Sequence, residues 1–364
     1  MKMKIVFLYS SLAIMGGIER VLVDKMNQLV RLYGYHIYML TSDQGHHAVP
    51  FQLDKRVCMQ DLQINFHSQY KFRNWRRFKE RRCLSRLYHQ RLKEKLRIIK
   101  PDIIVCTTSQ DVHGLLSLKG NCHLVVESHV NFSHPDTWWH CIQNRINNYW
   151  IGKAEAVVTL TEGDAINWRR VNRNVHVIPN VVHLNDTGRY SSYINKRAIF
   201  VGRLVEQKGL SDLIKVWRII NQRYPDWQLD IFGEGQMDSI PDINLVVHPP
   251  TPNIMDEYIK SSMLLVTSVY EPFGLVIPEA MSCGLPIIAF DCPYGPAEII
   301  TQGHDGFYIN NRDVYAMANR VCQLIEDKNL RQEMGRAAIK SAHNYSAYHI
   351  IPMWTALFES MIKK

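Results

Sequence analysis

The sequence has few features of a metal-binding, redox or membrane-spanning protein. No two of its eight cysteines are separated by only two residues, so zinc and dithiol spacings are absent and reduced thiols are expected. Apolar runs stay short of the roughly 18 residues that a membrane span requires. The three-glycine fingerprint of dinucleotide-binding domains is also missing. With 46% hydrophobic and 21% charged residues, the 364-residue chain has the composition of a globular protein of two domains.

Acidic residues are scarce in one stretch, which carries the positive charge of the whole chain. Residues 71–100 contain thirteen lysines and arginines and two acids, a net of +11 against +9 overall, so the remainder sums to −2. A chain-wide affinity for polyanions is therefore not indicated. Phe72, Trp75 and Phe78 fall three apart among these cations, and leucines follow, which predicts an accompanying apolar face. Such a helix fits an anionic membrane surface; a packed, solvated helix or a nucleic-acid-binding groove are the alternatives.

Apolar strand-like runs alternate with amphipathic helical stretches along the chain. The first half predicts strands at 5–10, 36–41, 57–60, 103–108, 123–128, 156–161 and 175–178, and a helix over 17–32. The second half predicts a strand and turn over 198–204, strands at 229–233, 245–248, 263–267, 286–290 and 306–309, and a helix over 209–224. The fold class is therefore α/β, with two tandem Rossmann-like domains. The expected boundaries are 1–182, a linker at 183–195, 196–345, and a helix at 346–364 that crosses back.

Two carboxylates bracket seven uncharged residues in the second half of the chain. Glu271 follows an apolar run that is typical of a buried strand, and Glu279 comes directly after a proline suited to a helix start. Glu271 is therefore expected in the loop at a strand's carboxyl end, with Glu279 on the first turn of the next helix. Open α/β sheets bind ligands at that edge. The helix dipole alone could also account for Glu279.

Glycines and cations mark the turns into the first helix of each domain. Gly16 and Gly17 precede the helix of the first domain, where backbone amides could face a phosphate or simply form a turn. Arg203 and Lys208 lie five residues apart at the corresponding turn of the second domain and could converge on a diphosphate. Two solvated surface cations are the plain alternative.

Taken in order, these motifs make the chain similar to the family-4 glycosyltransferases, which are retaining nucleotide-sugar enzymes with two Rossmann-like domains (GT-B). The matching segments are Gly16-Gly17-Ile-Glu-Arg-Val, Val201–Gly209, Phe232-Gly-Glu-Gly235, Glu271–Glu279 and Gly303-His-Asp-Gly306. The resemblance implies transfer of a hexose or N-acetylhexosamine from a nucleotide sugar, UDP-sugar favoured, to a lipid-linked or surface-polysaccharide acceptor. It implies no cofactor and no nucleic acid partner. We expect a cytoplasmic enzyme of bacterial type, bound peripherally to the inner face of the cytoplasmic membrane.

The resemblance also implies roles for particular residues. It places Glu271 at the donor sugar, Glu279 at the ribose, and His129 in the active site near the sugar. The expected catalytic residues are Glu271, His129, Arg203 and Lys208. The expected donor-binding residues are Gly16, Gly17, Arg203, Lys208, Phe273, Gly274, Leu275 and Glu279. The residues expected at the membrane or acceptor are Arg73, Trp75, Arg76, Arg77, Lys79, Arg81 and Arg82. Retention would follow from front-face substitution, with Glu271 positioning the sugar and stabilising charge.

No Asp-x-Asp pair occurs in the chain, although metal-dependent glycosyltransferases use that motif to hold a divalent ion. Arg203 and Lys208 are therefore expected to neutralise the diphosphate without metal. The loop 291–298 lacks the glycine pair common in the family, which leaves its donor contacts open. Two alternatives remain. One is a sugar-nucleotide epimerase, which the chain length favours over a phosphorylase; the other is a noncatalytic basic membrane- or nucleic-acid-binding protein.

Overall fold

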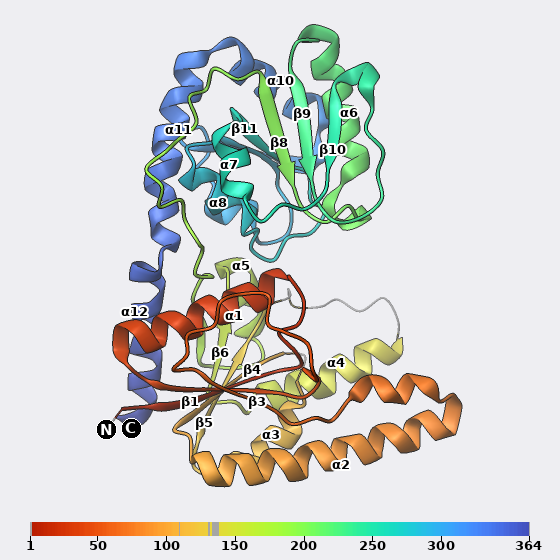
Figure 1. Cartoon of the computed structure of the whole chain (residues 1–364), viewed down its shortest axis with the longest axis vertical. Helices are drawn as coiled ribbons and strands as arrows, with labels where there is room; N and C mark the ends of the chain where they lie inside the picture. Colours follow the sequence, from red (N-terminus) through yellow and green to blue (C-terminus); the bar gives the residue numbers. More distant parts are fainter. Residues whose placement is uncertain (1, 109, 130–131, 133–137, 364) are drawn as a thin grey trace. The chain divides into compact units, whose positions relative to one another are not determined.

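The computed structural model describes residues 2–108, 110–129, 132 and 138–363. The chain forms two compact units, Met1–Val181 with Ile350–Lys364, and Val182–His349 (Figure 1). The C-terminal helix α12 (Ala347–Ile362) therefore ends in the first unit, where Trp354 and Phe358 are fully buried. Both ends of the chain belong to that unit.

The first unit is built, within the described residues, on a parallel sheet of seven strands in the order β3-β2-β1-β4-β5-β6-β7. The strands are β1 (Lys4–Tyr9), β2 (His36–Thr41), β3 (Cys58–Asp61), β4 (Ile103–Thr107), β5 (His123–Glu127), β6 (Ala156–Thr159) and β7 (Val175–Val177). The helices are α1 (Gly17–Gln28), α2 (Asn74–Ile99), α3 (Val112–Leu118), α4 (Trp138–Ile151) and α5 (Glu162–Trp168). A π-helical turn, Leu29–Tyr33, ends the stretch that was expected to be one α-helix.

The second unit contains, within the same limits, a parallel sheet of six strands in the order β10-β9-β8-β11-β12-β13. The strands are β8 (Arg197–Val201), β9 (Gln228–Phe232), β10 (Leu245–His248), β11 (Met263–Val266), β12 (Ile287–Phe290) and β13 (Gly306–Ile309). The helices are α6 (Leu210–Arg223), α7 (Ile254–Ile259), α8 (Val276–Ser282), α9 (Pro296–Ile299), α10 (Val314–Glu326) and α11 (Lys328–Ala342). Both sheets confirm the doubly wound pattern, because the central strands are apolar on both faces and helices cover them.

Residues 183–195 were expected to form a linker, but the structure places them in the second unit. The Asn185 amide donates to Ser282 Oγ at 3.0 Å, and the Ser191 amide donates to the carbonyl of Cys283 at 2.9 Å. Arg331 donates to the carbonyl of Tyr193, also at 2.9 Å. Backbone groups of this polar segment hydrogen-bond to neighbouring side chains and loops of the second unit. The sequence alone cannot distinguish such a packed segment from an exposed linker.

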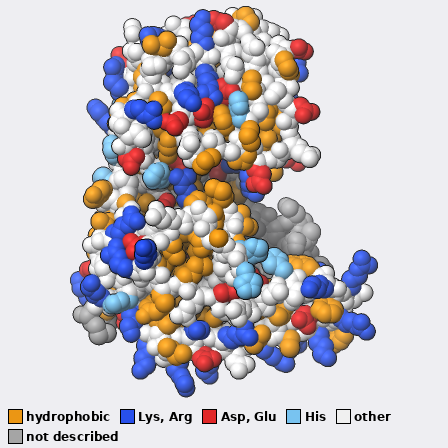
Figure 2. Space-filling model, viewed as in Figure 1, with side chains coloured by type: hydrophobic (Ala, Val, Ile, Leu, Met, Phe, Trp, Pro, Cys, Tyr) orange, Lys and Arg blue, Asp and Glu red, His pale blue; other side chains and the backbone are white. Residues whose placement is uncertain are grey.

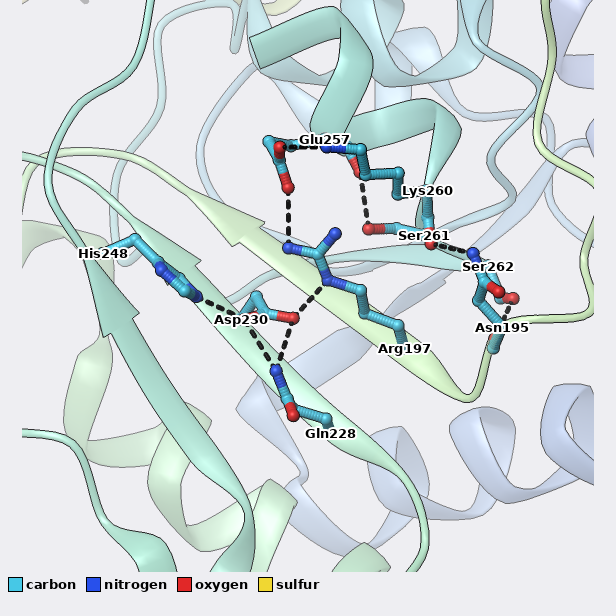
Figure 3. Close-up of polar contacts among 9 residues, drawn as sticks. All are labelled: Asn195, Arg197, Gln228, Asp230, His248, Glu257, Lys260, Ser261 and Ser262. Atoms are coloured by element: carbon cyan, nitrogen blue, oxygen red, sulfur yellow. Dashed lines mark hydrogen bonds and ion pairs between the residues drawn. The ribbon is translucent and has the colours of Figure 1, made fainter. Parts of the chain in front are cut away.

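A buried carboxylate joins three strands and a helix of the second unit (Figure 3). Asp230, in the middle of β9, is 0% exposed and pairs with Arg197 of β8 and His248 of β10. Gln228 Nε2 adds a hydrogen bond to Asp230 Oδ1 at 2.9 Å, and Arg197 reaches Glu257 of α7 at 2.8 Å. Every member of this network has a partner, so the buried charge of Asp230 is paired. The network therefore holds β8, β9 and β10 together with α7.

Further features bear on the chemistry that the chain could perform. Among the described residues, no helix is long and apolar enough to cross a membrane. The same residues contain no group of three or more histidine, cysteine or acidic side chains placed to hold a metal ion. The seven described cysteines are free thiols. Burial raises the pKa of Cys283 and of Cys292 to about 12, so both are neutral thiols at physiological pH.

Candidate active site

Glu271 and Lys208 form an ion pair at the carboxyl edge of the second sheet. Glu271 follows the end of β11, as predicted, and is 9% exposed. Its Oε2 pairs with Lys208 Nζ and also accepts a hydrogen bond from Ser268 Oγ at 3.2 Å. The two residues are 63 positions apart in the chain, so this contact joins two of the predicted motifs in one place.

A glycine brings the Lys208 turn against the strand that leads to Glu271. Gly209 has a φ of +68°, and a Cβ there would lie 2.0 Å from the carbonyl oxygen of Thr267. Thr267 Oγ1 in turn donates to the carbonyl of Lys208 at 2.9 Å. Only glycine allows both the left-handed backbone and this close approach, which explains why Lys-Gly ends the motif.

The stretch from Glu271 to Glu279 is a loop that turns into α8, as the sequence predicts. Gly274 has a φ of +88°, which a side chain would strain. Phe273 is buried and packs edge-on against Tyr345, with ring centres 5.5 Å apart. Glu279 lies in the first turn of α8 and is 5% exposed. Leu275 is the residue directly before the helix.

Arg203 follows β8 but is exposed, and the structure shows no contact between it and Lys208 or Glu271 among the described residues. Its neighbourhood is organised by glycines of the Phe232–Gly235 motif. A Cβ on Gly233 would lie 1.8 Å from the carbonyl oxygen of Gly202, so the two loops approach closely. The structure therefore brings Arg203 to the same sheet edge as Lys208, without uniting their side chains.

Arg312 is a residue of this edge that the sequence did not reveal. It follows β13 and donates to the carbonyls of Ser268 at 2.8 Å and Thr267 at 2.9 Å. It also pairs with Asp212 of α6 at 2.7 Å. Arg312 thus holds the segment that leads into Glu271 and ties it to the first helix of the unit.

An open pocket of about 690 Å³ lies at the carboxyl ends of β12 and β13. Its lining residues are Asp291, Cys292, Pro293, Tyr294, Ala297, Glu298, Asn310 and Asn311. This volume is in the range of small-molecule sites. The backbone of Tyr294 pairs with that of Glu271, and a Cβ on Gly295 would lie 2.6 Å from the Glu271 carbonyl oxygen. The loop that departs from the common family pattern therefore forms a pocket beside Glu271.

The first unit gathers buried polar atoms where β5, β6 and β7 end. His129 is 7% exposed, and its Nε2 lies 3.4 Å from Glu127 Oε2. Among the described residues, neither atom has a hydrogen-bond partner, and the same holds for Thr161 Oγ1 and Asn180 Oδ1. Since these strands are adjacent and parallel, their carboxyl ends lie together. Buried polar atoms without partners are rare in folded proteins, and a catalytic role is one of the explanations for them.

Gly16 and Gly17 lie at the N-terminus of α1, as predicted, but a carboxylate stands beside them. Glu19 is 8% exposed and accepts a hydrogen bond from the Tyr9 hydroxyl at 3.1 Å. A Cβ on Gly16 would come within 2.2 Å of Glu19 Oε2. Burial, and then the charge of Glu19, raise the pKa of Tyr9. The donor-binding role of the glycine pair stays a prediction, since Glu19 already faces that helix end.

Comparison with known proteins identifies the class of fold and enzyme. The family described as "Glycosyl transferases group 1" matches residues 194–341, and "Glycosyltransferase Family 4" matches residues 15–186. An uncharacterized glycosyltransferase of Haemophilus influenzae is 26% identical over 379 aligned positions, covering 97% of this chain and 99% of the relative. A poly(ribitol-phosphate) alpha-N-acetylglucosaminyltransferase of Staphylococcus aureus is 26% identical, over 89% of this chain and 71% of its own.

A solved structure is similar over almost the whole chain. A variant of Staphylococcus aureus TarM, in complex with fondaparinux, alpha-GlcNAc-glycerol and UDP, has a TM-score of 0.79. The match covers 98% of this chain and 100% of that one at 16% identity. Similarity at that identity concerns the fold, and it confirms the expected architecture of two Rossmann-like domains.

Proposed function

The chain belongs to the family-4 glycosyltransferases, and on that premise we propose that it transfers a hexose or an N-acetylhexosamine from a nucleotide sugar, UDP-sugar favoured, to a lipid-linked or surface-polysaccharide acceptor. Membership of this family decides against the epimerase and the noncatalytic binding protein. The acceptor class is suggested by the Staphylococcus aureus relative, whose name specifies a poly(ribitol-phosphate) substrate.

The observation that carries the proposal is the ion pair between Lys208 and Glu271. As the sugar departs from the diphosphate, negative charge develops on the leaving oxygens, and a preorganised cation stabilises it. The Lys208 side chain is 13% exposed, so water screens its charge only weakly. Glu271 balances Lys208 through Oε2, and we assign its other carboxylate oxygen to hydroxyls of the donor sugar.

We propose that transfer retains the anomeric configuration through attack on the face from which the diphosphate leaves. Two interactions on Oε2, from Lys208 and Ser268, stabilise the Glu271 carboxylate and make it a weaker nucleophile. Glu271 therefore positions the sugar and stabilises charge, and it forms no covalent intermediate. Lys208, with Arg203 at the same edge, would serve the diphosphate in place of a metal ion.

The donor reaction tests this assignment without knowledge of the acceptor. The enzyme is incubated with UDP-glucose or UDP-N-acetylglucosamine, and proton NMR follows the anomer of the sugar first released to water. We expect the α-anomer, at a rate that excess EDTA does not change. A β-anomer would refute retention, and a loss of activity in EDTA that Mg²⁺ restores would refute metal independence.

The basic helix α2 has two different parts. Its C-terminal part packs on the sheet through buried residues, which are Leu84, Tyr88, Leu92, Leu96 and Ile99. Around its N-terminus, Phe72, Trp75 and Phe78 are 40%, 73% and 49% exposed. The single apolar face predicted from the sequence is therefore wrong. At about 100° per residue, Trp75 and Leu84 fall on opposite sides of the helix.

We propose that the exposed end of α2 binds an anionic membrane surface on the cytoplasmic side. Figure 2 shows Lys and Arg side chains along the lower edge of the first unit, where Figure 1 places α2. Trp75 and Phe78 stack with ring centres 5.6 Å apart, and Arg82 lies 5.7 Å from the Phe78 ring. Interfacial helices combine inserted aromatics with cations in this way, and each cation near such a surface contributes about 1 kcal/mol.

Vesicle sedimentation tests the membrane proposal. The six cations to be replaced by glutamine are Arg73, Arg76, Arg77, Lys79, Arg81 and Arg82. The matched control replaces six exposed cations of the second unit, which are Arg189, Lys196, Lys215, Arg218, Arg223 and Lys260. We expect the α2 variant to lose binding to anionic vesicles more than tenfold and the control to keep most of it. Equal binding by both variants would refute the proposal, and strong RNA or DNA binding lost only in the α2 variant would favour the nucleic-acid alternative.

A further inference from the structure

A lysine is completely buried in the first unit. Lys25 lies on α1 and is 1% exposed. Its Nζ contacts Glu127 Oε1 and lies 4.0 Å from the ring centre of Trp354 on α12. A buried ion pair is a poor device for stability alone, because apolar side chains of similar volume often serve as well or better. The pair is therefore expected to have a functional role, and the contact of Glu127 with His129 suggests which one.

Glu127 links this lysine to the candidate catalytic histidine. It is the last residue of β5 and 1% exposed, with Oε1 at Lys25 and Oε2 3.4 Å from His129 Nε2. Burial would raise the pKa of Glu127, but the charge of Lys25 and then the interaction with His129 outweigh burial and hold that pKa at about 2. Burial lowers the pKa of Lys25, and the charge of Glu127 opposes that shift. The direct contact between Lys25 Nζ and Glu127 Oε1 favours the charged form of both groups, so the carboxylate is ionised and its other oxygen faces one ring nitrogen of His129.

We propose that Glu127 is the positioning residue of His129 and that Lys25 keeps it ionised for this purpose. An ionised carboxylate beside Nε2 selects the tautomer that carries its hydrogen there and restrains the ring, leaving Nδ1 for the donor sugar. Both side chains are 1% exposed, so we assign neither a contact with substrate, and both act through His129. The inference rests on the proposed role of His129 at the donor.

Two further groups lie near the Lys25–Glu127 pair, and both are uncharged. From β4, Cys106 also faces Glu127, but burial and then the charge of Glu127 raise the pKa of this thiol, which keeps it neutral. From α12, Trp354 contributes an aromatic face and no charge. At the present separation of 3.4 Å, His129 Nε2 and Glu127 Oε2 form no aligned hydrogen bond, and such contacts often tighten when substrate binds.

A charge-neutral double variant tests whether Glu127 positions His129 without leaving a buried charge unpaired. Lys25→Met with Glu127→Gln keeps the volumes and removes the charges. The matched control is Lys119→Met with Glu155→Gln, another lysine–glutamate pair of the first unit, 2.7 Å apart. Both proteins are compared with the parent in melting temperature, in kcat and donor KM for UDP-sugar turnover, and in the imidazole nitrogen shifts of His129. The His129→Gln spectrum assigns these shifts.

We expect the Lys25/Glu127 double variant to fold, to lose about tenfold in kcat with KM within twofold, and to lose the Nε2–H tautomer signature. The Lys119/Glu155 control should change none of these. Parent-like kcat together with a parent-like tautomer would overturn the inference and leave the pair with a packing role only.

If His129→Gln itself keeps full kcat, the proposed role of His129 fails; the nitrogen shifts still decide whether Glu127 sets the tautomer. If the double variant does not fold, Glu127→Asp and Glu127→Gln are compared: equal kcat in these two would also overturn the inference.

Discussion

Lys208→Met should lower kcat for donor turnover by about 10²–10³-fold, the range found when one donor to a developing oxyanion is removed. The expected size follows from the burial of the Lys208–Glu271 pair, in which both side chains are little exposed, at 13% and 12%. In that setting water cannot replace the missing cation at the leaving diphosphate. Release of UDP from UDP-glucose and UDP-N-acetylglucosamine, followed by a coupled assay, measures the effect.

A lysine that pairs with a carboxylate elsewhere on the second unit provides the control. Lys196 pairs with Asp226 at the surface, where the side chains are 59% and 54% exposed. Lys196→Met should therefore change kcat by less than twofold, because water already screens the charges of this exposed pair. Lys208→Arg should recover part of the lost rate, since it restores the charge. Parent-like turnover by folded Lys208→Met would show that Lys208 does not serve the leaving group.

Much of the sheet could be predicted because strands buried on both faces are short apolar runs. β10 (Leu245–His248) and β13 (Gly306–Ile309) match the expected bounds residue for residue. β2 (His36–Thr41) matches as well, and the remaining strands differ from the expected bounds by one to three residues at an end. The place of Glu271 in a loop and of Glu279 on a first helical turn followed from the same reasoning, because an apolar run, a proline and spacing are local signals.

Contacts between distant parts of the chain could not be predicted in this way. Arg312 meets Asp212, which lies 100 positions away, and nothing near either residue marks the pair. Lys25 falls on the apolar stripe of α1, between Leu22 and Leu29, yet its charge suggests a surface position. Only the fold shows that Glu127 makes its burial possible. Asp230 is a similar case, a carboxylate inside a strand whose partners come from neighbouring strands.

Glu279→Gln should weaken UDP binding by about tenfold to a hundredfold while leaving kcat at saturating donor within threefold. We assign this carboxylate, 5% exposed in the first turn of α8, to the ribose hydroxyls. A charge-assisted hydrogen bond of that kind contributes about 1.5–3 kcal/mol, and 1.4 kcal/mol corresponds to a factor of ten in Kd. Isothermal titration calorimetry with UDP measures the change directly.

The contrast with Glu271 makes the Glu279 experiment decisive. Glu271→Gln should bind UDP within threefold of the parent but turn over slowly, because Glu271 faces the sugar, which UDP lacks. Glu333→Gln, an exposed glutamate on α11, should match the parent in both measurements. The competing explanation is that Glu279 only complements the dipole of α8, which contributes about 0.3–1 kcal/mol. That explanation predicts a lower melting temperature with an unchanged Kd for UDP, so affinity and stability together separate a ribose ligand from a helix cap.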